Sequence, residues 1–374
     1  MRAGREGAQR AAYDAWAVDH SVRTMMRDPL ADVLSRFGYA LLAPAERIGA
    51  GTLNHNYLVR TDGGAFVLRR IRDDQPDTRV AFEHDTLRWV AAQGFPVATP
   101  IAPSVASSRR PADELPATCV RLEPSDARGE TERGRWALFP FVEGRFVRRG
   151  ALRTTEAATL GDMHGRLHAA LRDHPRSADA RFDMQWSAEQ SAAALERIEH
   201  IARSRDASAE ALEGIALQRR LLDGSDVRPP SAFAQLPCQW MHGDFHVEQV
   251  LFAAGASITA ILDWELCQSN ARAWELIRSL AFSGLLDGPD AATYLRAYRC
   301  HVPIRRDELE LGLSLWWQSR IVGVWVWWAA FVAGNDRVHA FIPDTAQTLR
   351  RLSEPGWRDR VDQRILNAAQ DPFG

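Results

Sequence analysis

Two carboxylates, two imidazoles and a side-chain amide lie close together in one part of the sequence. They are His242, Asp244, His246, Gln249 and Asp263. The apolar residues around them form two β-like runs, and the Ala-, Gly- and Ser-rich segment between these runs predicts a hairpin loop. Two carboxylates and an amide oxygen at the end of a hairpin suit phosphoryl transfer. One carboxylate orients or accepts the proton of a substrate hydroxyl, while the other and the amide hold Mg²⁺ against the nucleotide phosphates.

The order of these residues resembles the catalytic and metal-binding loops of the aminoglycoside phosphotransferase and choline kinase family, the small-molecule branch of the protein-kinase-like fold. That family's loop reads His-Gly-Asp-x-His-x-x-Asn and is followed by an Ile-Asp-Trp/Phe-Glu-type segment. The matching positions in this chain are His242, Gly243, Asp244 and His246. The resemblance implies that Asp244 acts on the acceptor hydroxyl, with His242 and His246 beside it in the catalytic loop. Histidine and aspartate in turns also serve as caps or core hydrogen-bonding groups, so the combination of both segments carries the interpretation.

The resemblance implies Mg²⁺ binding by Asp263 together with the residue at the Asn position of the loop. In this chain that residue is Gln249. Glutamine keeps the carbonyl oxygen of asparagine and adds one methylene of reach, so we expect it to serve as a metal ligand.

The resemblance also implies an α+β fold with two lobes, a small β-rich one and a large, mostly helical one. We expect residues 1–143 to form an N-terminal extension and the nucleotide-binding lobe. Residues 144–374 would form the helical lobe, with the catalytic and metal-binding loops and the acceptor site. In the hinge-like segment before this boundary, backbone groups near Phe139 and Phe141 would contact the base of the nucleotide, although Pro140 has no N–H to donate.

Within the first lobe, Gly49, Gly51 and Asn54 stand where a glycine-rich loop would cover the nucleotide phosphates with backbone N–H groups. A strand, an Asp-Gly-Gly turn and a returning strand follow. Two glycines before a strand are by themselves only a turn, so the strands that follow are needed for this interpretation.

The chain contains no lysine, so all 46 of its basic Lys and Arg residues are arginine. An arginine must therefore replace the lysine that usually contacts the phosphates in this family. Strand alternation places Arg69 and Arg70 on opposite faces, and the family pattern matches Arg69. Its predicted carboxylate partner is Glu83 on the following helix, with Asp85 as the second candidate. A solvent-exposed arginine at the end of a strand is the alternative for one of the two arginines.

His164 and His168 are four residues apart on a predicted helix, a spacing that can bind a metal. No third ligand accompanies them in the sequence motif, so we interpret them as core or surface histidines. The C-terminal half is rich in tryptophan. Most of these side chains are expected in the core, and one or two are candidates to stack on the acceptor.

The composition excludes several classes of function. A net charge of −2 and a pI of about 6.6 give no electrostatic case for binding nucleic acid or an anionic membrane. The four cysteines have no CxxC spacing, and the start of the chain has no signal-peptide pattern. The longest apolar run, 321–334, has 14 residues, too few to cross a bilayer, and is expected to form a buried helix. These features favour a cytoplasmic protein.

The sequence therefore predicts a Mg²⁺-dependent enzyme that transfers the γ-phosphate of ATP or GTP to a hydroxyl of a small molecule, such as an antibiotic, a sugar or an amino alcohol. An antibiotic acceptor would imply a role in resistance. The missing lysine and Gln249 keep open the alternative of a kinase-like nucleotide-binding module without catalysis. A protein kinase is less favoured, because the helix predicted from Ala271 begins too soon after Asp263 to leave room for an activation loop.

Overall fold

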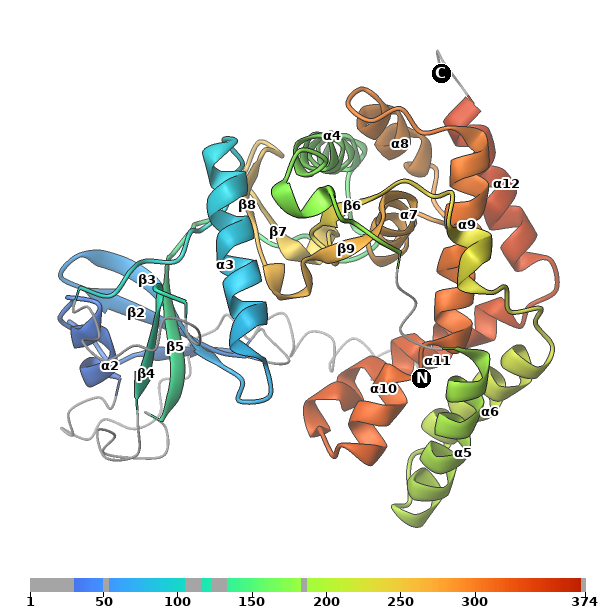
Figure 1. Ribbon diagram of the computed structural model, residues 1–374, viewed down its shortest axis with the longest axis horizontal. Helices are drawn as coiled ribbons and strands as arrows, with labels where there is room; N and C mark the ends of the chain where they lie inside the picture. The colour runs from blue at the N-terminus through green and yellow to red at the C-terminus, as the bar shows by residue number, and fades with distance from the viewer. Residues whose placement is uncertain (1–29, 50–53, 105–115, 123–132, 183–186, 371–374) are drawn as a thin grey trace. The chain divides into compact units, whose positions relative to one another are not determined.

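The computed structural model describes residues 30–49, 54–104, 116–122, 133–182 and 187–370 (Figure 1). The chain divides into two compact units. Unit 1 comprises the described residues up to Glu143 together with Thr259–Glu265, and unit 2 comprises the remainder from Gly144 onward. The predicted division assigned 259–265 to the second lobe. They group with unit 1 because Ile261 N–H donates to Pro96 O (2.7 Å) and Thr259 Oγ1 donates to Glu143 O (3.0 Å).

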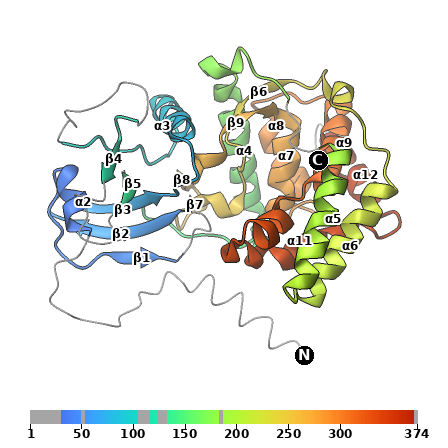
Figure 2. The ribbon, with the colours of Figure 1, turned by 60° about the horizontal axis from the view of Figure 1, so that its bottom comes forward.

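Unit 1 is built on an antiparallel sheet. Its described elements are α2 (Ala31–Arg36), β1 (Glu46–Ile48), β2 (His55–Thr61), β3 (Gly64–Ile71), α3 (Asp77–Ala92), β4 (Cys119–Leu122) and β5 (Gly134–Pro140). The strands pair in the order β1-β2-β3-β5-β4, and β1, β2 and β3 lie side by side in Figure 2. The register sets Asn56 opposite Arg69, and Arg69 opposite Ala137. The predicted hairpin and the helix after it are both present.

The core of unit 1 lies between α2 and the sheet. Val33 and Leu34 of α2 are fully buried against Leu68, Trp136 and Leu138, the inward-facing residues of β3 and β5. Full burial of one such aliphatic side chain stabilises the fold by roughly 1.5–3 kcal/mol. This packing fixes the faces of β3, and so decides which way Arg69 points.

Unit 2 is mostly helical. Its helices are α4 (Thr154–Leu171), α5 (Ala188–Ser204), α6 (Ala209–Asp223), α7 (Arg272–Phe282), α8 (Ala291–Arg299), α9 (Arg306–Val322), α10 (Trp325–Trp327), α11 (Ile342–Leu352) and α12 (Trp357–Gln370). The short strand β6 (Cys238–Met241) pairs with β9 (Gln268–Ala271) in an antiparallel ladder. Strand β7 (Val250–Phe252) leads through a turn, closed by Ala253 N–H to Ser257 O (2.8 Å), into β8 (Ile258–Ile261), whose residues from Thr259 onward belong to unit 1. Short 3-10 turns occupy Pro175–Ser177, Pro230–Phe233, Val247–Gln249, Trp264–Leu266 and Asp336–Phe341, and a π-turn occupies Trp328–Val332. The α+β class predicted from the sequence is confirmed.

One helix prediction was wrong. The apolar run 321–334 was expected to form a single buried helix, but α9 ends at Val322, and the chain restarts as α10 and a π-turn. Trp327 is fully buried, whereas Trp325 in the same run is 46% exposed. The break follows from Gly323, whose φ of −75° and ψ of 107° are not helical. No helix within the described residues is both long and apolar enough to span a membrane.

Candidate functional site

The His-Gly-Asp sequence forms a tight turn directly after β6. Gly243 has a φ of +85°, and a Cβ at this position would lie 2.0 Å from Leu266 O, so only glycine fits. The buried His242 accepts the Asp244 backbone N–H at its Nδ1 (3.2 Å). These two constraints fix the direction in which the Asp244 side chain leaves the turn.

Both carboxylate oxygens of Asp244 are occupied. Arg278 of α7 donates from Nε to Oδ1 (3.0 Å) and also pairs with this atom through its terminal nitrogen, while His246 Nε2 lies 3.4 Å from it. Gln249 Nε2 donates to Oδ2 (3.3 Å). Burial alone would raise the pKa of Asp244, but the charge of Arg278 and the hydrogen bond from His246 outweigh it and hold the pKa well below its usual range. Asp244 is therefore ionised throughout the physiological pH range.

Arg278 belongs to a group of three arginines around one aromatic ring. The guanidinium carbons of Arg278, Arg149 and Arg320 lie 4.5, 5.5 and 5.9 Å from the centre of the Phe282 ring. We call these three residues the arginine group. Arg149 pairs with Asp344 (2.7 Å). Burial and the neighbouring guanidiniums lower the pKa of Arg320 to about 10.

Tryptophans flank the arginine group. Arg278 lies 5.4 Å from the ring centre of Trp274, and Arg320 lies 5.4 Å from that of Trp316. Within the described part of the chain, no carboxylate forms an ion pair with Arg320. The group thus carries three positive charges against the two of Asp244 and Asp344, and its surplus charge is positive.

In unit 1, Arg69 forms a buried ion pair with Glu83 of α3. The distance from its terminal nitrogen to Oε1 is 2.8 Å, and the two side chains are 17% and 5% exposed. Arg69 Nε also donates to Asn56 Oδ1 (3.2 Å), and its guanidinium lies 4.9 Å from the ring centre of Phe139. Arg70 points to the other face and pairs with Asp73 instead. The alternation argument therefore places the two arginines correctly.

Two further carboxylates surround this pair. Burial alone would lower the pKa of Arg69, but the negative charges of Glu83, Asp263 and Glu265 raise it. Burial and the charge of Glu265 raise the pKa of Glu83, and Arg69 only partly opposes them. The backbone carbonyl of Glu265 accepts from Arg79 (2.8 Å), and its Oε2 accepts from Asn54 Nδ2 (2.7 Å).

We call this set the acidic cluster; it comprises Arg69, Arg79, Glu83, Asp263 and Glu265. It has three carboxylates against two guanidiniums, so its surplus charge is negative. Asp263 has a φ of +56°, a left-handed conformation that is uncommon for any residue but glycine. Strained backbone of this kind is concentrated at functional sites.

The other residues predicted to contact the nucleotide differ in their exposure and in their hydrogen-bond partners. Gly49 is exposed at the end of β1, and Gly51 lies outside the described residues. Asn54 accepts the Arg72 N–H and binds Glu265, so its side chain orders the acidic cluster. Phe139 packs beneath Arg69, but the Phe141 N–H is donated to Ala65 O (3.1 Å). Phe141 therefore does not have a free N–H for a base.

Sequence reasoning did not find Arg278, Arg320 or Glu265. Arg278 follows Trp274 by one helical turn on an amphipathic helix, but this local pattern does not link it to Asp244. Glu265 is the last residue of the Asp-Trp-Glu segment, and only the folded chain places its charge near Arg69. Arg320 has no signal in the sequence that distinguishes it from other helical arginines.

Comparison with known proteins shows which family the chain resembles. Residues 44–311 match the model of a family described as the phosphotransferase enzyme family. A homoserine kinase from Burkholderia cenocepacia (strain HI2424) is 26% identical over 296 residues, which cover 73% of this chain and 79% of that protein.

Solved structures show the same fold at low sequence identity. An aminoglycoside phosphotransferase from Alicyclobacillus acidocaldarius has a TM-score of 0.53 at 16% identity, covering 93% of this chain and 99% of its own. Spectinomycin phosphotransferase, solved in complex with ADP and spectinomycin, has a TM-score of 0.52 at 14% identity, covering 92% and 100% of the two chains.

Proposed function

The chain belongs to the phosphotransferase enzyme family, and from this premise we propose that it transfers the γ-phosphoryl group of ATP or GTP to a hydroxyl of a small molecule. A homoserine kinase among its relatives and the ADP bound by a protein of the same fold support a nucleotide donor and a hydroxyl acceptor. Each step of the proposal rests on one of the two charged groups described above.

The observation that carries the proposal is the buried Arg69–Glu83 pair. In a chain without lysine, a catalytic role requires another fixed cation near the phosphates, and a guanidinium held by a carboxylate can still offer its remaining N–H groups to phosphate. The Arg69 and Glu83 side chains are only 17% and 5% exposed, so the charged pair is held in a largely buried setting. The pair therefore favours an active enzyme over the binding-module alternative.

Residues of the acidic cluster fit Mg²⁺. Carboxylate oxygens are the donors that Mg²⁺ prefers, and a surplus negative charge with a strained Asp263 is suited to a cation. We propose Asp263 as the main protein ligand, and Gln249 of unit 2 stays a second ligand predicted from the sequence. A bound Mg²⁺ would supply positive charge that offsets the charge of the phosphates.

Asp244 is proposed to orient the acceptor hydroxyl. Its pKa is held well below the usual range, so it is a weak base, and its contribution lies in accepting a hydrogen bond from the hydroxyl. Phosphoryl transfer proceeds through a loose transition state in most analyses, so a correctly aimed nucleophile matters more than early removal of its proton. Arg278, Gln249 and His246 hold the carboxylate in place for this.

The arginine group indicates the class of acceptor. Its surplus positive charge lies at the side chain that binds Asp244, and Trp274 and Trp316 border it. A polycationic acceptor would be repelled there, whereas a carboxylate can pair with Arg320, which has no ion-pair partner in the described chain. We therefore propose a hydroxylated acceptor that carries a carboxylate, the class to which the substrate of the homoserine kinase relative belongs.

A phosphate-transfer screen with ATP and GTP tests this function. Hydroxy amino acids and hydroxy acids, amino alcohols, sugars and aminoglycosides would be compared, and the phosphomonoester product detected by ³¹P NMR. Turnover is expected only with Mg²⁺ and mainly with carboxylate-bearing acceptors. Arg320→Met should raise the acceptor KM by about 10- to 150-fold with an unchanged nucleotide KM, because a charged hydrogen bond is worth about 1.5–3 kcal/mol.

The matched control is Arg172→Met, which removes an exposed arginine of the same unit and should leave both KM values unchanged. Preference for an amino alcohol or an aminoglycoside would contradict the proposed carboxylate-bearing acceptor. It would still support the proposed phosphotransfer. Absence of transfer with every acceptor, despite Mg²⁺-dependent nucleotide binding, would favour the binding module.

A further inference from the structure

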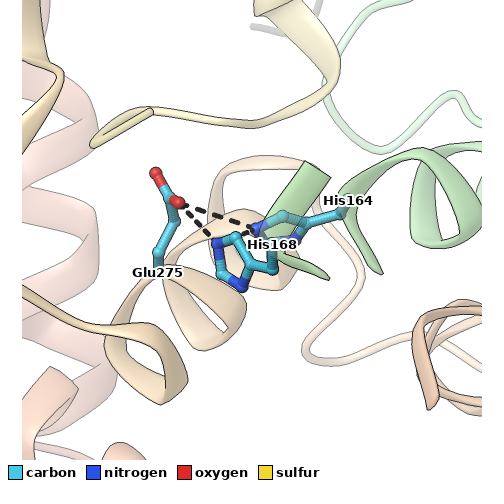
Figure 3. Close-up of side chains that lie close together, drawn as sticks. All are labelled: His164, His168 and Glu275. Carbon is cyan, nitrogen blue, oxygen red and sulfur yellow. Dashed lines mark hydrogen bonds and ion pairs between the residues drawn. The ribbon is translucent and has the colours of Figure 1, made fainter. Parts of the chain in front are cut away.

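Two histidines and a glutamate converge in the interior of unit 2. His164 Nε2 and His168 Nε2 are 3.0 Å apart, and Glu275 Oε2 lies 2.7 Å from the second and 3.7 Å from the first (Figure 3). All three side chains are completely buried. The histidines come from one face of α4 and the glutamate from α7, 107 residues further along the chain. The sequence therefore shows the histidine pair without its third member.

We propose that His164, His168 and Glu275 form a structural binding site for a divalent transition metal ion, with zinc as the preferred ion. Two imidazole nitrogens and one carboxylate oxygen are a common zinc donor set. Zinc bonds of about 2.0–2.1 Å at tetrahedral angles place the ligand atoms about 3.3 Å apart. The three observed separations, 2.7, 3.0 and 3.7 Å, lie on both sides of that value.

The outer hydrogen bonds prepare both rings for a metal. His164 Nδ1 lies 2.6 Å from the Tyr294 hydroxyl, and His168 Nδ1 lies 2.8 Å from the Tyr298 hydroxyl. A partner at Nδ1 fixes the ring orientation and leaves Nε2 as the coordinating atom, as outer partners do in zinc sites.

Two small residues make these contacts possible. A Cβ on Gly161 or Gly165 would lie 2.3 or 2.5 Å from a backbone oxygen of α8, so glycine lets the two helices approach closely. This approach brings the tyrosine hydroxyls of α8 onto the histidines of α4, which alternate with the glycines along the same face.

Hydrogen bonding alone leaves one buried atom of the cluster without a partner. His164 Nε2, His168 Nε2 and Glu275 Oε2 lie close together, and the protons that they share depend on the tautomers of the two rings. Glu275 Oε1 is buried with no hydrogen-bond partner in the described chain, and no arginine in that part of the chain forms an ion pair with this carboxylate. A buried carboxylate in such a setting is costly unless a cation accompanies it.

The site would support the catalytic loop. The His164 ring stacks on Phe245, the residue after Asp244, with ring centres 4.6 Å apart and 21° between the planes. Glu275 lies one helical turn before Arg278, which binds Asp244. A metal joining α4 to α7 would therefore hold both the floor of the catalytic loop and the helix that carries its arginine.

The test uses the full-length protein with Cys300→Ser, which removes the exposed cysteine as an adventitious ligand. The chain is unfolded with a chelator and refolded with Zn²⁺, with Mg²⁺ or without metal, and bound metal is measured after gel filtration. We expect one zinc per chain, no retained magnesium, and a higher Tm in the zinc sample only. Failure to retain zinc, with the same Tm in all three samples, would overturn the proposal and leave a hydrogen-bonded network.

Variants locate the ion independently of activity. Glu275→Gln keeps the size of the side chain and should abolish zinc retention. The control variant His174→Gln lacks another buried histidine of unit 2 and should retain the zinc fully. If Glu275→Gln does not fold, the absorption spectrum of His164→Cys refolded with Co²⁺ tests the site instead. A thiolate ligand from Cys at this position would add a sulfur-to-cobalt charge-transfer band. Zinc retained by Glu275→Gln, or Co²⁺ bound by His164→Cys without that band, would contradict the assigned site. Both readouts measure metal binding directly, so they stay distinguishable from a failure of the proposed phosphotransfer.

Discussion

Unit 1 and unit 2 each hold a buried arginine–carboxylate pair, but the charges around the two pairs differ in sign. The acidic cluster of unit 1 has more carboxylates than guanidiniums, and the pKa of Glu83 is raised by burial and Glu265. In unit 2 the arginine group has the surplus, and the pKa of Asp244 is held far below its usual range. Similar pairs thus prepare opposite environments, one suited to a cation and one to an anion.

We propose that this difference gives each unit its own task. A surplus of negative charge beside a fixed guanidinium suits a metal–nucleotide complex, because carboxylates can hold Mg²⁺ and a guanidinium can bind phosphate. A surplus of positive charge beside an ionised aspartate suits an acceptor with a carboxylate and a hydroxyl. Each of the following variants changes one side of the comparison.

The largest effect is expected for Asp244→Asn. Asparagine keeps the shape of the side chain and loses the charge, so the acceptor hydroxyl is no longer oriented by a carboxylate. Turnover should fall by about two to four decades in steady-state assays. Turnover equal to wild type would remove Asp244 from the mechanism. Asp226→Asn, at a loop position of the same unit, is the control and should be silent.

Arg69→Ala should have the next largest effect. Loss of a charged contact to phosphate is worth about 1.5–3 kcal/mol, so kcat/KM for the nucleotide should fall by about 10- to 150-fold. Glu83→Ala should give a weaker loss, and the double variant should be no worse than Arg69→Ala, because the two residues act as one unit. Strictly additive losses would show that they act separately. Arg70→Ala, on the other face of β3, is the matched control.

Arg278→Gln tests why the pKa of Asp244 is low. Without this guanidinium, burial raises the pKa, because the main opposing charge is lost. A carboxylate whose pKa rises becomes protonated at higher pH, so the acid limb of kcat/KM should move upward by about 1–3 pH units. An unchanged limb would mean that another group holds Asp244 ionised.

Part of the candidate site could be predicted from the sequence. Arg69 and Glu83 were predicted because each depends on a local period, two along a strand and 3.6 along a helix. Arg278 was missed because its partner lies 34 residues away, and no local pattern links an α7 arginine to the loop. The prediction of one helix over 321–334 was wrong for a related reason. The apolar content of this run does not indicate that Gly323 is nonhelical.

The last effect concerns stability, not turnover, and involves His84. Burial lowers the pKa of this side chain to about 3, so it stays neutral in the folded chain while its unfolded form gains a proton below pH 6.5. The free energy of unfolding should therefore fall with decreasing pH, by up to about 1.4 kcal/mol per pH unit below 6.5. The free energy of unfolding, measured with urea at pH 6, 5 and 4, should fall less steeply in His84→Gln, because this variant lacks the proton that His84 takes up on unfolding. An identical slope in the variant would mean that His84 is protonated in the folded chain.

The division of tasks is tested most directly by measuring the Kd of Mg²⁺-ATP by calorimetry for Asp244→Asn and Arg69→Ala. Asp244→Asn should bind the nucleotide as tightly as wild type although it transfers no phosphate at a useful rate. Arg69→Ala should bind it at least about 10-fold more weakly, because we propose that the guanidinium contacts the phosphates in the ground state. Weakened binding in Asp244→Asn with unchanged binding in Arg69→Ala would contradict the assignment of the nucleotide to the acidic cluster.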